Sequence, residues 1–309
     1  MIKNFLQILL NRNVILISAV VLGLTIGQNA VHLKPYTTYI LIITMLFSMT
    51  GLSTKSLFPL RKVVKPMLMG TFLNYFIFGF VVVLFAWFLM PHDQLFYGFV
   101  VIAAAPPGVA IVPFSGILKG DIEYSIIGVF GAFLAAIVIT PIVIGLFSGF
   151  EDTVNPVSLI FLMIKLIVVP LVLSRLLLIK AFFPITRKIR GKMVDVGFAL
   201  IIFTAVGMNR QVFFQDYDVL LLISLVLLAG TFGIGSLYEY LLKRTKQNSE
   251  ITTSQILLLT VKSSGFSVVT AFTLFGEKAA IPSAVLAVIV LLYLLFLSSR
   301  IELKKVFKR

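Results

Sequence analysis

Residues 257–267 read Leu-Leu-Leu-Thr-Val-Lys-Ser-Ser-Gly-Phe-Ser, which places polar residues in the middle of the apolar run 251–276. The run is long enough to cross a bilayer as a helix, since about 20 apolar residues suffice. At a rise of about 1.5 Å per residue, Lys262 lies roughly 16 Å from the nearer end of the run, deeper than a lysine side chain can snorkel. A charge at that depth is costly unless it faces protein or a watery cavity, so Lys262 marks a candidate functional site.

A second interruption lies in the first half of the chain, at Ala105-Pro106-Pro107-Gly108-Val109-Ala110. Proline removes a backbone donor and clashes with the preceding turn, and glycine tolerates the torsions that follow. Carbonyls freed at membrane depth must be satisfied by a cavity, water, ions or neighbouring protein. A simple proline kink would also explain this stretch. Because the two interruptions occupy matching positions in two halves of the chain, we interpret both as parts of a transporter's binding site.

The composition indicates an all-α polytopic membrane protein. Of the 309 residues, 60% are hydrophobic and only 12% are charged, with a mean hydropathy of +1.10. Soluble domains of this size do not have such a composition. The formal net charge of +14 would suggest nucleic-acid binding in a soluble protein, but here the bases cluster between apolar runs. Cysteine is absent, which excludes disulfides and thiolate-bound metals.

Ten spans of suitable length can be drawn, and the bases between them predict the orientation. With a cytoplasmic N-terminus, 21 of the 26 Lys and Arg residues fall on the cytoplasmic side and three on the other, while Lys165 and Lys262 lie deep within spans. This split predicts that both termini are cytoplasmic. The membrane that we expect is the bacterial inner membrane. The predicted spans are 14–30, 37–53, 66–90, 94–118, 122–148, 157–181, 194–209, 218–242, 251–276 and 280–299.

Ten spans form two sets of five, and an odd number gives the second set the opposite orientation. We therefore expect one transporter domain, 1–309, built from two inverted repeats, about 1–150 and 151–309. Gly-Thr-Phe at 70–72 recurs at 230–232, and Gly108 and Gly265 follow at offsets of 38 and 35 residues. The tripeptide alone is weak, but the similar offsets favour a repeat.

Lys262 has three possible roles. It could be paired inside the bundle for structure alone, attract the acidic group of an anionic substrate, or stand where a coupling cation would bind and exchange a proton. Asn74, at a similar depth in the third span, could pair with it or simply bind a neighbouring helix. The two breaks predict a substrate site at Pro107, Gly108, Val109, Ser263, Ser264 and Gly265.

Enzyme chemistry has little support in the sequence. The histidines, His32 and His92, fall in separate outer loops, and no paired carboxylates lie deep within spans. Walker and dinucleotide fingerprints are also missing. We therefore expect no enzyme activity, no catalytic residues, no cofactor and no metal site.

The stretch 105–110, followed by Lys119-Gly120-Asp121, resembles the bile acid:sodium symporter family. That family's fourth helix typically reads Ala-Pro-Gly-Gly-Thr-Ala-Ser-Asn, with a Lys-Gly-Asp at the same distance. The resemblance extends over nearly the whole chain. It implies that helices 4 and 9 are unwound where they cross, in a core of helices 3–5 and 8–10. A panel of helices 1, 2, 6 and 7 would rock against this core, with the substrate between them.

The departures from the family pattern concern its two sodium sites. Ile111 and Val112 replace the Ser-Asn pair, Leu258 replaces an acidic ligand, and Lys262 replaces a glutamine, while Asn74 matches a glutamine of the third helix. Hard cations need oxygen ligands, and two unit charges 4 Å apart repel by about 4 kcal/mol at an effective dielectric of about 20. We therefore expect a sodium-independent relative in which the Lys262 ammonium takes the second sodium position, held by Asn74 and the freed carbonyls.

The sequence thus predicts a secondary transporter of a small organic anion, bile-acid-like or a carboxylate metabolite, that works by alternating access. The expected partners are this substrate, the lipid bilayer and, if Lys262 couples to them, protons, but not nucleic acid. Two alternatives stay open. A cation/proton antiporter would use similar repeats but usually has carboxylates at the crossing. A membrane sensor with the same fold would need no transport.

Overall fold

The computed structural model describes residues 12–51, 60–90, 93–108, 110–148, 156–245 and 247–306. The regular secondary structure of this part is helical apart from one isolated β-bridge, as predicted for an all-α protein. The α-helices are α2 (Arg12–Ile26), α3 (Thr37–Met49), α4 (Leu60–Thr71), α5 (Gly79–Leu89), α6 (Asp93–Ala104), α7 (Ile111–Ile117), α8 (Ile122–Ser148), α9 (Pro156–Met163), α10 (Val169–Leu176), α11 (Phe183–Met208), α12 (Arg210–Phe214), α13 (Tyr217–Leu228), α14 (Ile234–Lys243), α15 (Ser249–Thr260), α16 (Ser264–Phe275) and α17 (Ile281–Val306).

Shorter helical segments join some of these helices. Three are π-helical and continue an α-helix on both sides, whereas three others are 3₁₀ turns. The π-helical segments are η4 (Phe72–Phe78), η5 (Ile164–Val168) and η6 (Ala229–Gly233), and the 3₁₀ turns are η1 (Gly27–His32), η2 (Lys34–Tyr36) and η7 (Lys278–Ala280).

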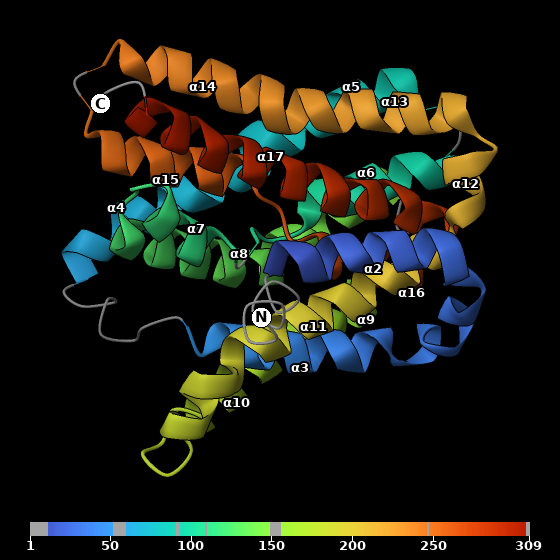
Figure 1. Ribbon diagram of the computed structural model, residues 1–309, viewed down its shortest axis with the longest axis horizontal. Helices are drawn as coiled ribbons and strands as arrows, with labels where there is room; N and C mark the ends of the chain where they lie inside the picture. The colour runs from blue at the N-terminus through green and yellow to red at the C-terminus, as the bar shows by residue number, and fades with distance from the viewer. Residues whose placement is uncertain are drawn as a thin grey trace.

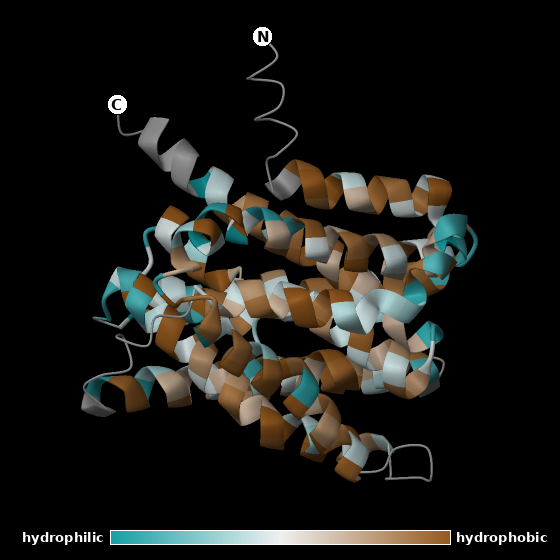
Figure 2. Ribbon diagram, turned by 90° about the horizontal axis from the view of Figure 1, so that it is seen from below, coloured by the Kyte–Doolittle hydropathy of each residue, from teal (hydrophilic) through white to brown (hydrophobic). Residues whose placement is uncertain are grey.

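Seven helices in the described part are long and apolar enough to cross a membrane. Figure 2 shows hydrophobic residues along the middle of the bundle and hydrophilic residues gathered at its two ends. Two shorter apolar helices, Gln94–Ala104 and Ser264–Phe275, lie beside the interruptions. The seven are Val14–His32, Lys62–Leu89, Ile122–Ser148, Val157–Leu176, Phe183–Met208, Tyr217–Lys243 and Lys278–Arg300.

The seventh predicted span, 194–209, was wrong at its start. The helix begins at Phe183, eleven residues earlier, and includes the bases at 187, 188, 190 and 192, which the prediction placed on the cytoplasmic side before the span. A helix can carry bases in the headgroup region beyond its apolar part, because the hydrocarbon core is only about 30 Å thick.

The helices pack in two groups that meet at the interruptions. On one side α11 packs against α2 and α3, and on the other α8 packs against α4 and α6 (Figure 1). The helix pair α16 and α17 contacts α6 as well as α11. Among the largest fully buried side chains of the described residues are Phe99, Phe133 and, unusually, Lys262. A fully buried lysine is expected only where it has polar partners.

Candidate functional site

The two interruptions lie side by side as a pair of antiparallel extended segments. One segment joins α6 to α7, and the other joins α15 to α16. The Gly108 amide donates to the Val261 carbonyl at 2.8 Å, and the Ser263 amide donates to the Pro106 carbonyl at 3.0 Å. Pro107 and Lys262 are the paired residues of the isolated bridge. Each break therefore satisfies backbone groups that the other has freed, as the interior of a membrane requires.

Lys262 sends its ammonium group away from solvent into a ring of backbone carbonyls. Its Nζ donates to the carbonyls of Asn74 at 3.1 Å, Ala103 at 3.0 Å and Ala105 at 2.6 Å. The residue is only 2% exposed. An ammonium has three N–H donors, so three carbonyls satisfy it completely, whereas a neutral amine would leave one carbonyl facing its lone pair. The geometry fits the charged form of Lys262.

Local structure explains why these carbonyls are free to accept. Ala103 and Ala105 lie at and just beyond the end of α6, where the last carbonyls of a helix have no intrahelical partner. The negative end of the helix dipole also favours a cation at this place. Asn74 lies in the π-helical segment η4, a geometry that recurs at functional sites.

Two aromatic rings complete the surroundings of the ammonium. Its Nζ lies 4.9 Å from the centroid of the Tyr75 ring and 5.4 Å from that of Phe78, both within cation–π range. The Tyr75 hydroxyl donates to the Ala132 carbonyl on α8 at 2.9 Å, which fixes the ring. We call the carbonyls of Asn74, Ala103 and Ala105 together with these two rings the lysine cage.

Asn74 takes part in the cage mainly through its main chain. The sequence predicted that Asn74 and Lys262 lie together, and they do, but the contact uses the Asn74 carbonyl oxygen. The side-chain Nδ2 donates instead to the Ala105 carbonyl at 3.1 Å, which therefore accepts from both residues. Among the described residues, no hydrogen-bond partner reaches the buried Oδ1 of Asn74.

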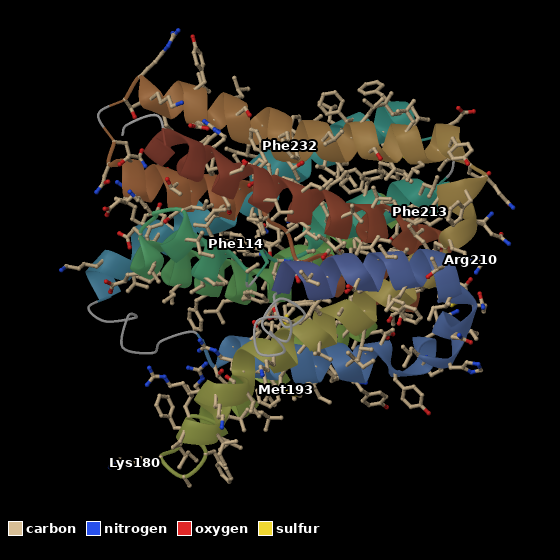
Figure 3. All side chains as sticks on the ribbon, viewed as in Figure 1. Phe114, Lys180, Met193, Arg210, Phe213 and Phe232 are labelled. Atoms are coloured by element: carbon tan, nitrogen blue, oxygen red, sulfur yellow. The ribbon has the colours of Figure 1, made fainter. Side chains whose placement is uncertain are left out.

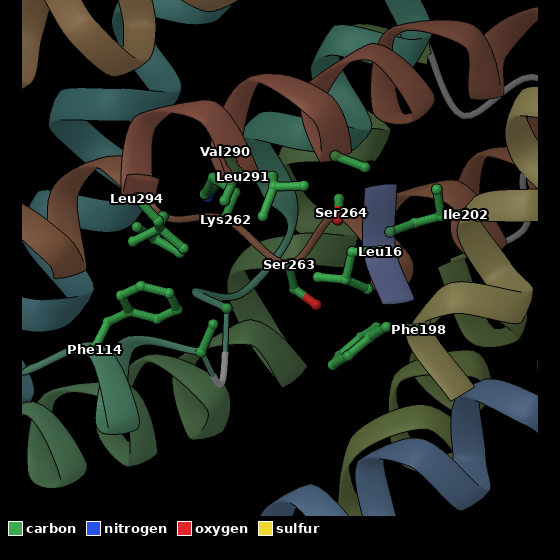
Figure 4. Close-up of a pocket in the computed structure, with 14 residues that line it drawn as sticks. Leu16, Phe114, Phe198, Ile202, Lys262, Ser263, Ser264, Val290, Leu291 and Leu294 are labelled. Atoms are coloured by element: carbon green, nitrogen blue, oxygen red, sulfur yellow. The ribbon is translucent and has the colours of Figure 1, made fainter. Parts of the chain in front are cut away.

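A cavity lies on the other side of the crossing segments. It has about 560 Å³ of empty space, a figure that includes the open solvent at its mouth. Figure 4 shows Ser263 extending its hydroxyl into this space, with Phe114 and Phe198 on either side. The wall is formed by Leu16, Gly108, Ala110, Phe114, Phe198, Ile202, Val261, Lys262, Ser263, Ser264, Ala287, Val290, Leu291 and Leu294.

Three of the predicted substrate residues, Gly108, Ser263 and Ser264, line the cavity. Pro107 and Gly265 are buried behind it and are not among its lining residues. Val109 lies outside the described residues. Ser263 is 3% exposed, and its hydroxyl has no hydrogen-bond partner among the described residues. A buried hydroxyl without a partner is costly, so this oxygen is an unsatisfied polar atom beside the cavity.

The remaining walls of the cavity were not predicted from the sequence. Leu16 on α2, Phe198 and Ile202 on α11, and a stripe of α17 are apolar residues in apolar helices. Nothing in their residue types distinguishes them from the rest of the core.

Lys165, the other lysine deep within a predicted span, lies away from the cage and the cavity. It is exposed on η5, and its Nζ is 5.5 Å from the centroid of the exposed Tyr39 ring near the start of α3. This placement agrees with the snorkelling arrangement expected of a lysine in a membrane helix. Within the described ranges, His, Asp and Glu side chains form no group of three or more that could hold a metal ion.

Comparison with known proteins relates the chain to a family and to a bacterial protein. The model of the Sodium Bile acid symporter family matches residues 38–216, more than half of the chain. The chain is also similar to a protein of Bacillus subtilis (strain 168) named as the uncharacterized sodium-dependent transporter YocS. The two are 27% identical over 278 residues, which cover 87% of this chain and 83% of that protein.

Proposed function

Because the chain belongs to the sodium bile acid symporter family, and is therefore a multi-pass membrane transporter, we propose that it carries a small organic anion by alternating access without sodium. The observation that carries this proposal is the buried Lys262 ammonium with three carbonyl partners. A cation-binding transporter would need such oxygens for its coupling ion. Here the Lys262 ammonium, a cation that is part of the chain, already binds these carbonyl oxygens.

Electrostatics supports sodium independence. A sodium ion 4 Å from the ammonium would meet a repulsion of about 4 kcal/mol at an effective dielectric of about 20. The side chains of Ile111 and Val112 offer no oxygen ligands at the neighbouring break. The Bacillus subtilis relative is named sodium-dependent, and we propose that this chain differs from it at the lysine cage.

The proposed architecture has ten helices in two inverted repeats, with the interrupted pairs α6–α7 and α15–α16 as helices 4 and 9. The π-helical segments support the repeat, since η4 begins at Phe72, the last residue of Gly-Thr-Phe 70–72, and η6 contains Gly-Thr-Phe 230–232, each in the helix preceding an interrupted one. The panel would consist of α2, α3, α9–α10 and α11, extending to Arg210 just after α11, and the remaining membrane-spanning helices would form the core, with α12 joining the two. Both termini would lie on the cytoplasmic side of the inner membrane, because the bases are distributed so unequally.

The cavity supports an anion with an apolar body as the substrate. α16 begins at Ser264, and the amides of Gly265 and Phe266 donate to no backbone carbonyl in the described part of the chain. Ser263 and Ser264 bring the positive end of this helix dipole to the cavity wall, beside the Ser263 hydroxyl, whereas Gly265 and Phe266 are not among the lining residues. The remaining cavity wall is largely apolar. A substrate with a carboxylate on a bile-acid-like or smaller hydrocarbon body would place the carboxylate near the polar groups and the hydrocarbon against the apolar wall.

The proposal can be tested with the purified protein in proteoliposomes. Thermal stabilisation by taurocholate, short monocarboxylates and neutral steroids selects a ligand, and its uptake is then measured with and without sodium. We expect equal uptake of the selected anion by the wild type in both conditions. Uptake by Lys262→Ala should be at least about tenfold lower than uptake by the wild type. The substitution leaves the three buried carbonyls without their donor, at about 1–3 kcal/mol for each, and 1.4 kcal/mol corresponds to a tenfold change in an equilibrium constant. Lys262→Gln restores the amide expected from the family pattern and should make uptake depend on sodium.

Lys165→Ala is the matched control, since it removes a lysine deep in a span but outside the cage. It should transport like the wild type. Sodium-stimulated uptake by the wild type would contradict sodium independence, and full activity of Lys262→Ala would remove Lys262 from the mechanism. Thermal melting of each variant separates loss of function from loss of fold.

A further inference from the structure

The connection between α10 and α11 forms an ordered hairpin at the edge of the bundle. The Ile179 carbonyl accepts from the amides of Phe182 and Phe183, each at 2.9 Å, which closes the turn. Figure 1 shows α10 and the start of α11 diverging from the other helices, and Figure 3 places Lys180 at the tip. We call residues 176–192 the basic hairpin.

The length of α11 places the basic hairpin at a membrane surface. α11 has 26 residues, which span about 39 Å, whereas the hydrocarbon core is about 30 Å thick. The apolar part of α11 lies toward its C-terminal end, so the excess falls on its first turns. The excess of about 9 Å corresponds to about six residues, 183–188, which carry Arg187 and Lys188 into the headgroup region, and the long side chains of Arg190 and Lys192 can extend back toward it.

The exposed side chains of the basic hairpin combine positive charge with large apolar groups. Its bases are Lys180, Arg187, Lys188, Arg190 and Lys192, all exposed, and no Asp or Glu occurs between residues 176 and 194. The apolar residues exposed among them include Ile179, Phe182, Phe183 and Ile185, of which Ile185 is 61% exposed. Aromatic and aliphatic groups beside Lys and Arg are typical of segments that lie in a membrane interface.

We infer that the basic hairpin binds the headgroups of anionic phospholipids in the leaflet at its end of the bundle. The bases would contact lipid phosphates, while Phe182, Phe183 and Ile185 would enter the boundary between headgroups and acyl chains. An acidic protein partner would explain the charge but not the apolar groups at the level of the interface. Juxtamembrane clusters of four to eight bases attract anionic lipids, and each base increases the affinity about fivefold.

The absence of cysteine allows a direct test with the full chain. A fluorophore is attached to Ile185→Cys, and the protein is placed in nanodiscs that contain phospholipids brominated close to the headgroup. The quenching by brominated phosphatidylglycerol is compared with the quenching by brominated phosphatidylcholine. We expect phosphatidylglycerol to be preferred by roughly fivefold or more. The positional control is Leu237→Cys, an exposed residue on α14, which runs along the opposite edge of the bundle (Figure 1). It should show no such preference.

Charge removal then identifies the lipid-binding groups. Lys180, Arg187, Lys188 and Lys192 are changed together to Gln, while Arg190 is kept because it lies against Gly51. The preference at Ile185→Cys should disappear in this variant. Removal of Lys62, Lys65, Lys119 and Arg244, which are predicted to lie on the same side of the membrane, should leave it unchanged. Equal effects of the two sets, equal quenching by both lipids, or no quenching by either would overturn the inference.

Discussion

Gly108 shows at the scale of one residue why the crossing needs particular amino acids. A Cβ added to Gly108 would lie 3.0 Å from the Lys262 carbonyl oxygen and 3.2 Å from Cγ1 of Val261. Both distances are shorter than ordinary contacts, and the carbonyl belongs to a backbone that cannot turn aside. Glycine therefore permits the two extended segments to approach closely enough for the bond between the Gly108 amide and the Val261 carbonyl.

We predict that Gly108→Ala separates the crossing segments. Overpacking of this kind costs about 1–3 kcal/mol, so the unfolding temperature should fall and transport should fall with it. Both are measured on purified protein, by thermal melting and by uptake.

Gly191→Ala provides the matched control for this prediction. A Cβ added to Gly191, in α11, meets no atom within 4 Å, and alanine in a helix is about 0.5–1 kcal/mol more favourable than glycine. It should leave transport intact and should not lower the unfolding temperature. Equal losses in both variants would contradict the steric explanation.

The sequence identified the site residues that stand out from their apolar surroundings. Lys262 and Gly108 interrupt apolar runs, and the structure brings them to one place. It did not identify the oxygens that hold the ammonium, because every residue carries a carbonyl and the residue type says nothing about which one is free. The cage depends on where α6 ends and where the π-helical segment falls, so Asn74 takes part through its main chain.

At the scale of the element, α15 is held in place by a polar junction around Gln255. Its Nε2 donates to the Tyr124 hydroxyl at 2.8 Å, and its Oε1 accepts from the Tyr238 hydroxyl at 3.0 Å and from Nε2 of Gln247 at 2.7 Å. Gln255 is buried, and its partners lie on α8, on α14 and in the turn before α15. One amide thereby ties three helices together near one end of the bundle, two turns before the crossing.

We predict that Gln255→Leu destabilises the protein by about 2–4 kcal/mol. The substitution removes three hydrogen bonds and leaves the two tyrosine hydroxyls without this partner, and each unsatisfied buried group costs about 1–3 kcal/mol. The measurement is thermal or denaturant unfolding in detergent. Gln247→Leu removes only one of these bonds from an exposed position and should cost less than about 1 kcal/mol. Similar costs for the two variants would show that the junction does not support α15.

The prediction of elements succeeded where hydropathy and chain breakers are decisive. Span 122–148 coincides with α8, and the chain leaves helical geometry at both predicted interruptions. The predicted start of α11 was wrong, since hydropathy marks the edge of the apolar part and not the end of the helix. The π-helical segments were not predicted because they differ from α-helix by only one residue in the hydrogen-bonding pattern.

At the scale of the whole molecule, one ion pair joins the two helix groups on the face opposite the basic hairpin. Lys34 of η2 and Glu277, just before η7, approach to 2.5 Å, and Lys34 also lies 5.9 Å from the centroid of the Phe272 ring. The cavity lies toward the other face, since Leu16 is near the start of α2 and Lys34 follows its far end. Exposed pairs contribute only about 0–1 kcal/mol, enough to bias two conformations without locking either.

We predict that linking these two positions stops transport if the proposed panel moves against the proposed core. Lys34→Cys and Glu277→Cys introduce two thiols into a chain that has none, and a bifunctional methanethiosulfonate reagent joins them reversibly. Uptake should fall to background when the link forms and return after reduction. Alternating access requires the closed face to open, and the link prevents this separation.

The control pair is Gln28→Cys with Arg210→Cys, on the same face of the molecule. The Arg210 guanidinium donates to Gln28 Oε1 at 2.7 Å, and both residues adjoin helices assigned to the panel. Figure 3 shows Arg210 at the end of the bundle away from Lys180. A link within the panel should leave uptake unchanged, because the two positions would move together. If the Lys34–Glu277 link also leaves uptake unchanged, the two groups do not separate at this face and the assignment of panel and core is wrong.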